Sequence, residues 1–351
     1  MREWTKNIRR VEPYVPGEQP KADNIIKLNT NENPYPPAPA VLKAASEMDA
    51  NPLRLYPDPK IEKLVNALAK SHGVDSEQVF AGVGSDDVLS MIFLTFFNSD
   101  KPVLFPDITY SFYKVWADVY RIPYETPALN DDFRIVAADY YRDNGGVVIT
   151  NPNAPTSIAE GLDFIRDILE HNRDSVVVVD EAYIDFGGET AIPLLKEYDN
   201  LIVVRTFSKS RSMAGLRVGY AIAGKEIIKA LNDVKYSINS YTLNMPAIDL
   251  ATLAVESEEY YEEITAKIIA TRERTVKALV ELGFTCLPSS ANFVFAKHER
   301  IPAETIFNAL KERGIYVRYF NAPRINEYLR ITIGTDEEMD KVLDFLKGYC
   351  L

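Results

Sequence analysis

The sequence is short of the residues that disulfide frameworks and metal centres need. Its 351 residues include 2 cysteines and 3 histidines. Cys286 and Cys350 lie far apart, and no histidine has a cysteine or a second histidine at metal-ligand spacing. We therefore expect a reducing compartment, no disulfide and no His/Cys metal site.

Long hydrophobic runs are also missing. The longest mostly apolar stretch, LSMIFLTFF, is too short to cross a bilayer. The opening residues, MREWTKNIRR, lack the apolar core of a signal peptide. These observations predict a cytoplasmic protein with no membrane partner.

Positive charge is in the minority, with 39 Lys and Arg against 51 Asp and Glu and a net charge of -12. This balance argues against a broad nucleic-acid-binding surface, which needs clustered basic residues. It leaves room for a local cationic pocket that binds a small anion. The chain is longer than a single core usually supports, so two lobes are expected.

The pattern along the chain divides into three parts. Residues 1–35 are rich in Pro and Asn, few of which can sit in regular structure, and predict an arm that packs on another part of the structure. Residues 36–245 alternate short β-branched runs with helical segments, which is typical of a mostly parallel sheet covered on both faces. Residues 246–351 open with a long helical region followed by the order strand, helix, strand, strand, helix, which predicts a smaller α+β lobe.

Polar residues gather where the predicted strands end. Ligands of open α/β sheets bind outside the carboxyl ends of the strands, so these residues are expected to share one edge. They are Gly84, Ser85 and Asp86 after VFAGV, residues 151–157 after VVIT, Asp180 and Tyr183 after SVVVV, and Thr206, Ser208 and Lys209 after NLIVVR, with Arg217 further on.

Each of these residues has an ordinary structural explanation when it is taken alone. A lysine after a strand is usually solvated, Asp180 suits a turn or helix cap, and Ser85 suits a helix N-cap. Their joint position is what indicates pyridoxal phosphate. That cofactor needs a lysine amine for a Schiff base and an acid against its pyridine nitrogen.

The cofactor's phosphate needs several donors. The backbone N–H groups of Gly84, Ser85 and Asp86 at a helix N-terminus would supply some of them. The hydroxyl of Thr206 or Ser208 would add to these. The guanidinium of Arg217 would add a charge-assisted fork.

The motifs DEAYIDF and RTFSKSRSMAGLRVGY resemble those of the fold-type I PLP-dependent aminotransferases, and within their class II subfamily the histidinol-phosphate branch. The similarity extends over LNTNENPYPP, LYPDP, PDITYSFY, NPNAPTS and LRITIGT. It implies a homodimer with an α/β fold, in which a large domain with a mostly parallel seven-stranded sheet carries a small α+β domain. It also implies that the arm, residues 1–35, packs on the active site and on the dimer partner. The implied activity is transamination of L-histidinol phosphate with 2-oxoglutarate in histidine biosynthesis, which yields imidazole-acetol phosphate and L-glutamate.

The resemblance also implies roles for the cofactor-facing residues. Lys209 is the Schiff-base lysine and proton carrier, Asp180 meets the pyridine nitrogen, and Tyr183 hydrogen-bonds the ring oxygen. Tyr110 stacks on the ring, where a merely structural aromatic residue would be the default. Tyr56, in LYPDP, reaches the phosphate of the neighbouring subunit's cofactor.

Three further residues are implied on the substrate side. Tyr14 on the arm faces the substrate, Arg330 in LRITIGT grips its anionic group, and Arg318 in VRYF is a second substrate arginine. An exposed charge at a strand edge is the alternative explanation for both arginines.

One position departs from the family pattern. The asparagine that contacts the ring oxygen in the family aligns here with Ala154. Either Asn153 or Asn151 shifts to replace it, or Tyr183 makes that contact alone. We include Asn153 among the expected cofactor contacts. Losing one neutral hydrogen bond costs about 1 kcal/mol, which would tune rather than abolish catalysis.

Other functions remain alternatives. A threonine-phosphate decarboxylase or an aromatic amino acid aminotransferase would keep every cofactor-binding residue. A non-catalytic PLP-binding or regulatory protein is disfavoured because the lysine set is intact and no separate DNA-binding segment is present. A nucleotide-binding oxidoreductase would need G-x-G-x-x-G, and GVGSDD lacks the third glycine.

Overall fold

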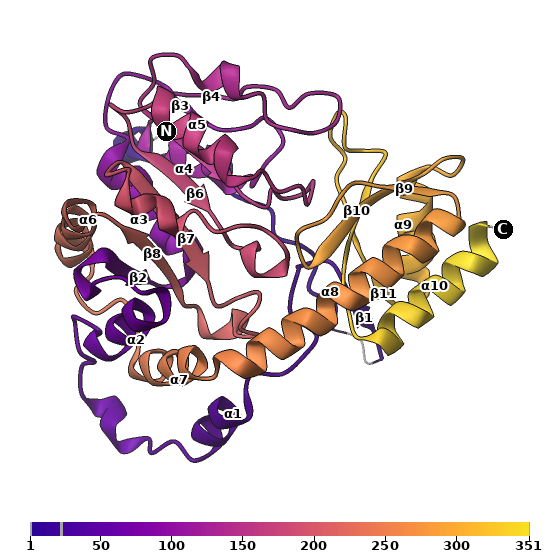
Figure 1. The fold of residues 1–351 in the computed structure, drawn as a ribbon, viewed down its shortest axis with the longest axis horizontal. Coiled ribbons are helices and arrows are strands. Elements are labelled where there is room, and N and C mark those ends of the chain that lie inside the picture. Colours follow the sequence, from indigo (N-terminus) through magenta and orange to yellow (C-terminus); the bar gives the residue numbers. More distant parts are fainter. Residues whose placement is uncertain (1, 22–23, 351) are drawn as a thin grey trace.

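The computed structural model describes residues 2–21 and 24–350, which form two lobes connected by a long helix (Figure 1). The larger lobe is built on a seven-stranded sheet of order β2-β8-β7-β6-β5-β3-β4. Its strands are β2 (Val79–Gly82), β8 (Gly219–Ala223), β7 (Leu201–Thr206), β6 (Val177–Asp180), β5 (Gly146–Thr150), β3 (Val103–Leu104) and β4 (Tyr124–Glu125). Strand β8 runs antiparallel to β2 and β7, and the other pairs are parallel. The predicted mostly parallel seven-stranded sheet is confirmed.

The central strands are apolar throughout because helices cover both faces of the sheet. Along β6, Val177 and Val179 enter one core while Val178 enters the other. The first core is covered by α1 (Pro39–Ser46), α2 (Glu62–His72), α5 (Leu162–His171) and α7 (Met245–Glu256). The second is covered by α3 (Gly84–Phe96), α4 (Phe112–Tyr120) and α6 (Lys225–Ile238). Burial on both sides explains the β-branched runs that the sequence displays.

The smaller lobe contains a four-stranded antiparallel sheet of order β12-β13-β10-β9. Its strands are β9 (Phe284–Cys286), β10 (Phe293–His298), β12 (Arg318–Tyr319) and β13 (Leu329–Thr332). Helices α8 (Glu258–Glu281), α9 (Ala303–Glu312) and α10 (Asp336–Cys350) belong to this part of the chain. A short strand near the N-terminus, β1 (Ile26–Lys27), pairs in parallel with β11 (Ile315–Tyr316). The α+β character predicted for this lobe is confirmed.

The packing divides the two lobes later than the predicted boundary at residue 246. Helix α7 lies with α1 and α2 in the core of the large lobe. Along α8, Tyr261 and Ile264 still contribute to that core, whereas Ile268 belongs to the core of the small lobe. An apolar helix pattern records that a face is buried but not which core buries it, so the sequence could not assign α7.

Short 3-10 helices connect several of these elements. They are η1 (Glu3–Asn7), η2 (Asn51–Arg54), η3 (Ser76–Gln78), η4 (Ala137–Tyr140), η5 (Ile184–Phe186), η6 (Ile192–Lys196) and η7 (Ala214–Leu216). Over the ranges that the structure describes, no helix is both long and apolar enough to cross a membrane.

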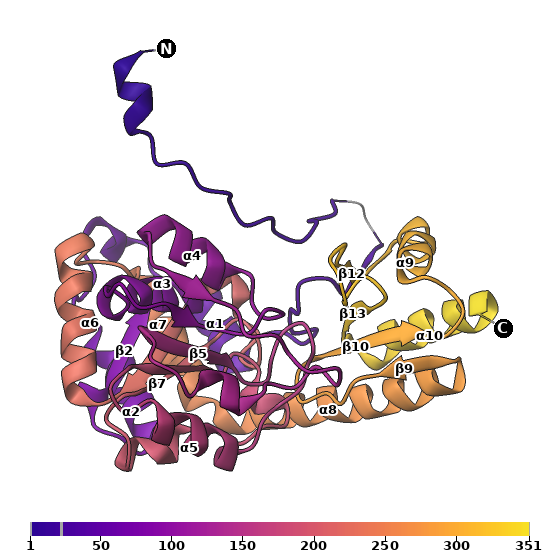
Figure 2. The ribbon, with the colours of Figure 1, turned by 90° about the horizontal axis from the view of Figure 1, so that it is seen from above.

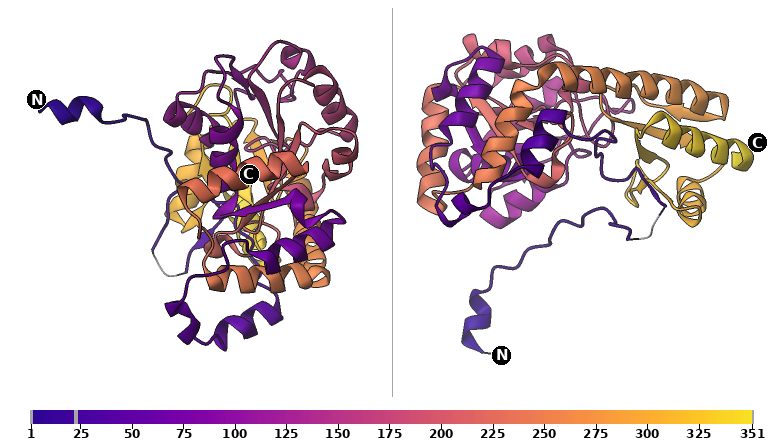
Figure 3. Two further views of the ribbon diagram at one scale, coloured as in Figure 1. Left: turned by 90° about the vertical axis from the view of Figure 1, so that its left-hand side faces the viewer. Right: turned by 90° about the horizontal axis from the view of Figure 1, so that it is seen from below.

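Residues 2–21, the first described part of the predicted N-terminal arm, run out from the body of the molecule, with η1 at their far end (Figures 2 and 3). Trp4 and Val15 are 61% and 73% exposed. The arm touches α4, because the ring of Tyr14 stacks on Phe112 with centroids 4.3 Å apart. The sequence predicted an arm with little regular structure, and within residues 2–21 and 24–35 only η1 and β1 are regular elements.

Candidate active site

A cavity of about 530 Å³ lies at the carboxyl ends of the parallel strands of the large sheet. Thr150, Asp180 and Thr206, which end β5, β6 and β7, all line it. The segment 29–32 and two arginines of the small lobe complete its wall. The predicted site residues that line it are Tyr14, Ser85, Asp86, Tyr110, Asp180, Tyr183, Thr206, Ser208, Lys209, Arg217, Arg318 and Arg330.

Lys209 lies in the turn that follows β7. The turn is closed by backbone hydrogen bonds from Met213 N to Phe207 O (3.0 Å) and from Ser212 N to Lys209 O (3.3 Å). The Lys209 amine donates to the carbonyl oxygen of Thr30 at 3.2 Å and lies 5.6 Å from the centre of the Tyr183 ring. The turn thus presents a primary amine to the cavity, next to a neutral acceptor.

Asp180 is a carboxylic acid in a buried position, with 3% of its surface exposed. Its Oδ2 accepts a hydrogen bond from the hydroxyl of Tyr113 at 2.7 Å, and its Oδ1 accepts one from the backbone of Ala182 at 3.2 Å. Burial raises the pKa of Asp180 to about 6, although both hydrogen bonds oppose the shift. The carboxylate is therefore placed where a cationic partner in the cavity would stabilise it.

The raised pKa of Asp180 predicts a pH dependence in the cofactor-free protein. Because the pKa in the folded protein lies above the ordinary value of 3.8, the folded form binds the proton more tightly. The associated stability is complete below pH 3.8 and is lost as the pH rises through about 6. We expect the free energy of unfolding to fall by about 3 kcal/mol relative to Asp180→Asn between these limits.

Urea titrations of the cofactor-free wild type and Asp180→Asn at several pH values would measure this difference. Comparing the two proteins cancels the other titrating groups. Parallel stability curves from pH 4 to pH 7 would contradict the assignment.

The N-terminus of α3 and Arg217 line the cavity from the large lobe, whereas Arg318 and Arg330 line it from the small lobe. Gly84 opens α3 with φ +83°, and a Cβ there would lie 2.4 Å from Nη2 of Arg217. A Cβ on Gly219 would lie 2.2 Å from the backbone nitrogen of Ser85. The guanidinium of Arg217 donates to Asp86 at 3.2 Å and to the hydroxyl of Ser208 at 3.4 Å. Helix N–H groups, a hydroxyl and an arginine thus meet in a place suited to an anion.

Two aromatic residues border this space. The hydroxyl of Tyr110 donates to Asp86 at 2.7 Å, and its ring lies 6.5 Å from that of Tyr14. Burial and the nearby Asp86 raise the pKa of Tyr110, so its hydroxyl stays protonated as a donor. Tyr56 is elsewhere: it is 80% exposed and stacks on Tyr241 at 4.6 Å.

The structure does not bring Asn153 to the cavity. Its amide donates to Ile108 O and to Thr156 Oγ1, both at 3.0 Å, and accepts from Thr109 Oγ1 at 2.8 Å. Asn151 is bound to the backbone of Glu160 through both ends of its amide. The side-chain amides of both asparagines are occupied by these hydrogen bonds. Neither therefore replaces the asparagine that the family has at the position of Ala154.

Ala154 itself lines the cavity, and so does Tyr183. The hydroxyl of Tyr183 accepts a hydrogen bond from Asn31 Nδ2 at 2.9 Å. Asn31 is in turn held by Thr332, whose hydroxyl donates to Asn31 Oδ1 at 3.0 Å. The proton of the Tyr183 hydroxyl therefore remains available to a ligand, while its position is fixed by Asn31.

Arg318 and Arg330 come from adjacent strands of the small lobe and lie opposite each other in the β12–β13 pairing. Arg330 Nη2 donates to Asn29 O at 2.9 Å, whereas its buried Nε has no hydrogen-bond partner among the described residues. Both guanidinium groups lie over the ring of Phe320, at 5.3 and 5.5 Å from its centre. Two cations held side by side, one with an unused donor, form a site for an anionic ligand group.

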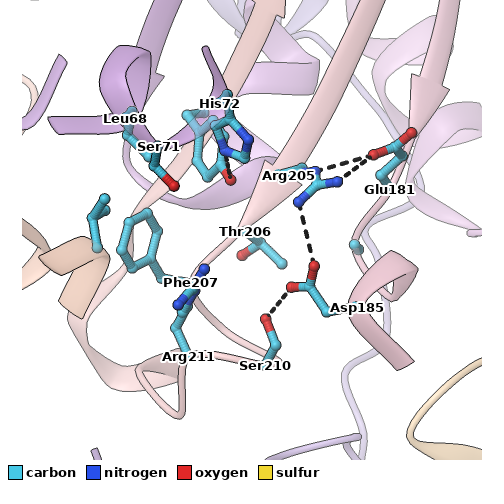
Figure 4. A pocket seen from close by; sticks show the side chains of 13 residues that line it. Leu68, Ser71, His72, Glu181, Asp185, Arg205, Thr206, Phe207, Ser210 and Arg211 are labelled. Atoms are coloured by element: carbon cyan, nitrogen blue, oxygen red, sulfur yellow. Dashed lines mark hydrogen bonds and ion pairs between the residues drawn. The ribbon is translucent and has the colours of Figure 1, made fainter. Parts of the chain in front are cut away.

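A cluster of charged residues lies beside Ser210, which directly follows Lys209 in the chain (Figure 4). Arg205 Nε donates to Glu181 Oε2 at 3.0 Å, and its Nη1 donates to Asp185 Oδ1 at 3.3 Å. Ser210, which directly follows Lys209, donates its hydroxyl to the other oxygen of Asp185. His72 stays neutral beside these groups, because burial and Arg205 lower its pKa to about 4. The cluster connects the turn that carries Lys209 to β7 and to the residue that follows β6.

Sequence reasoning missed several residues of this site. Tyr113 and Asn31 hold two predicted site residues in place, and Glu32 lines the cavity itself. The motif LNTNENPYPP contained Asn31 and Glu32, but nothing in a Pro- and Asn-rich segment indicates which side chains turn inward. Gly84, which the sequence did predict, does not itself line the cavity, but its backbone packs against Arg217, which does.

The comparisons with known proteins agree with this geometry. A family model described as "Aminotransferase class I and II" matches residues 23–346. This chain belongs to that family.

The chain is 53% identical over 350 residues to a histidinol-phosphate aminotransferase from Acinetobacter baumannii (strain SDF), covering 99% of this chain and 97% of that one. It is also similar to the crystal structure of histidinol-phosphate aminotransferase from Sinorhizobium meliloti in complex with pyridoxal-5'-phosphate. That match has a TM-score of 0.84 and 25% identity, over 92% of this chain and 91% of the other.

L-threonine-O-3-phosphate decarboxylase from Porphyromonas gingivalis has a TM-score of 0.79 at 22% identity, over 93% of this chain and 99% of that one. At that identity the likeness shows the fold alone, so the fold by itself does not distinguish the two reactions.

Proposed function

We propose that the protein is a histidinol-phosphate aminotransferase of histidine biosynthesis. It would transfer the amino group of L-histidinol phosphate to 2-oxoglutarate and release imidazole-acetol phosphate and L-glutamate. One observation carries the proposal: the amine of Lys209, the carboxylate of Asp180 and two small-lobe arginines line the same cavity. The relatives that match this chain over nearly its whole length support the choice of substrate.

The residues of the cavity fit pyridoxal phosphate. The glycine-lined N-terminus of α3, Ser208 and Arg217 would hold its phosphate, and Asp180 would face its ring nitrogen. When bound, pyridoxal phosphate supplies an electron-withdrawing ring that stabilises negative charge on the substrate carbon and carries the amino group between the two substrates.

The chain's own groups would do the rest of the chemistry. Lys209 would bind the cofactor through its amine and, once released by the substrate's amine, remove the proton from the substrate carbon and return it as an acid. Asp180, ionised against the ring's cationic nitrogen, would keep that nitrogen protonated. Tyr183, fixed by Asn31, would donate its hydroxyl proton to the ring oxygen.

Arg330 and Arg318 would bind the substrate's phosphate. We expect Arg330→Gln to lower kcat/KM for L-histidinol phosphate by about 10–100-fold, because a charge-assisted hydrogen bond in a buried site is worth about 1.5–3 kcal/mol. Activity with unphosphorylated L-histidinol should change little. Steady-state assays with both substrates would measure the effect, with Arg300→Gln on the exposed surface of the same lobe as the control. Equal losses for both substrates would contradict the phosphate assignment.

We further propose a cytoplasmic homodimer. Tyr56 lies outside its own cavity, stacked on the exposed Tyr241, and its chain neighbours Leu53 and Leu55 are exposed too, so this apolar surface is available to a second copy. Two free cysteines suit a reducing compartment. Sedimentation velocity at micromolar concentration would test the dimer, and a single monomeric species would overturn it.

A coupled assay tests the reaction itself. Purified protein with pyridoxal phosphate, L-histidinol phosphate and 2-oxoglutarate should form L-glutamate. The alternatives are a threonine-phosphate decarboxylase and an aromatic amino acid aminotransferase. CO₂ release from L-threonine phosphate without glutamate formation would favour the first, and a preference for aromatic amino acids as donors would favour the second.

A further inference from the structure

The acidic residues that line the cavity differ in how much of their bonding capacity is used. Asp180 accepts a hydrogen bond on each carboxylate oxygen, and so does Asp86, from Tyr110 and Arg217. Glu32 also lines the cavity, but both of its hydrogen bonds, from Lys27 and Thr30, fall on Oε2. Among the described residues, none donates a hydrogen bond to Glu32 Oε1, and 43% of the side chain is exposed. Glu32 therefore has a free acceptor where a ligand would bind.

The environment of Glu32 favours the ionised form of its carboxylate. Although burial pushes the pKa of Glu32 up, the hydrogen bonds from Lys27 and Thr30 and the charges of Lys27 and Lys209 bring it below its ordinary value. The Lys27 ammonium and the Thr30 hydroxyl also fix the carboxylate, with Lys27 Nζ at 2.6 Å from Thr30 Oγ1. A fixed carboxylate with one free oxygen suits an N–H donor that carries full or partial positive charge.

The segment 29–32 orients this acceptor relative to the other ligand contacts. Asn29 O accepts from Arg330, Thr30 O accepts from Lys209, and Glu32 lies two residues beyond Thr30. The substrate proposed above has two arms on the carbon that bears its amine: one ends in phosphate and the other in imidazole. The order of these contacts along the segment assigns the phosphate to the Asn29 end and the amine to Thr30, which leaves the stretch beyond Thr30, where Glu32 lines the cavity, for the second arm.

We propose that Glu32 is the specificity residue for the substrate's imidazole, whose ring N–H donates to Oε1. This assignment rests on the proposed function and adds to it the contact that distinguishes an imidazole from a neutral ring of similar size. It also explains why the cavity contains Glu32, since each of the other two carboxylates, Asp86 and Asp180, already accepts a hydrogen bond on both oxygens.

The test compares two substrates and three proteins. The substrates are L-histidinol phosphate and L-phenylalaninol phosphate, in which a phenyl ring replaces the imidazole. The proteins, each saturated with pyridoxal phosphate, are the wild type, Glu32→Gln and Glu281→Gln. Glu281 ends α8 on the exposed surface, so its variant removes the same charge away from the cavity.

We expect Glu32→Gln to lower kcat/KM for L-histidinol phosphate by about 10–100-fold. For L-phenylalaninol phosphate it should change kcat/KM by less than about 3-fold, and Glu281→Gln should resemble the wild type with both. An equal loss with both substrates, or no loss with either, would overturn the assignment. The second substrate thereby separates recognition of the imidazole from any general effect of Glu32 on Lys209 or on folding.

Binding without turnover gives an independent measurement. Imidazolylpropyl phosphate keeps the imidazole and the phosphate but lacks the reacting amine. Calorimetric titration should show a dissociation constant raised by a similar factor in Glu32→Gln, and an unchanged constant would overturn the proposal. If the wild type itself fails to convert L-histidinol phosphate to product, the proposed function is wrong, and the assignment of Glu32 falls with it.

Discussion

Lys209→Ala is expected to lower kcat for transamination by at least about 10⁴-fold. The substitution removes the amine that would both anchor the cofactor and move the proton on the substrate carbon, and a positioned acid–base group alone contributes up to about 10⁴-fold. The structure offers few substitutes, since the other basic groups that line the cavity, Arg217, Arg318 and Arg330, are guanidinium groups and not primary amines. Residual activity should therefore be close to that of free cofactor in solution.

The same variant should also lose the visible absorbance band of lysine-bound pyridoxal phosphate near neutral pH. The fold should persist, because Lys209 contributes one hydrogen bond to Thr30 and its turn is closed by backbone hydrogen bonds that alanine retains. Absorbance spectra and far-UV circular dichroism would check both expectations. Lys277→Ala, on the exposed face of α8, is a matched control. A surviving visible band, or borohydride labelling at another residue, would mean that a different lysine binds the cofactor.

The sequence predicted the strand-end residues well because a parallel sheet leaves little freedom there. Four valines followed by Asp180 can only be a buried strand that ends in a polar group. The order of β5, β6 and β7 then brings Thr150, Asp180 and Thr206 to one edge. The position of a residue at this edge was therefore predictable from the local sequence pattern.

Residues that depend on long-range contacts were not predictable in this way. Nothing near Asn153 in the sequence indicates that its amide is occupied by Ile108 and Thr109, which belong to the loop between β3 and α4. Asn31 binds Tyr183 across 152 positions of the chain, and Arg330 binds Asn29 across 301. Such contacts follow from the way that residues 29–33, at the end of the predicted arm, pass between the two lobes, which no local pattern records.

Arg205→Met is expected to lower the free energy of unfolding by about 3–5 kcal/mol, the usual cost of removing one partner from a buried ion pair. The side chain of Glu181 is fully buried and that of Arg205 is 12% exposed. Removing the guanidinium would leave the Glu181 carboxylate with its hydrogen bonds from Thr190 and Ala191 but without a countercharge. Burial already raises the pKa of Glu181, and without the arginine it should rise further, so that the variant takes up a proton on folding.

Urea titration of the holoenzyme, followed by circular dichroism, would measure this loss against a matched control. Arg142 pairs with Glu125 at 2.9 Å, but both side chains are about half exposed, so Arg142→Met should cost less than about 1 kcal/mol. Adding Glu181→Gln to Arg205→Met should recover part of the lost stability, because it removes the unpaired buried charge. A loss below 1 kcal/mol in Arg205→Met would show that the ion pair contributes no more than a surface pair.

Ser210 and Asp185 connect this arginine to the turn that carries Lys209. If the double variant recovers stability but not kcat, the ion pair contributes to positioning Lys209 in addition to stabilising the fold.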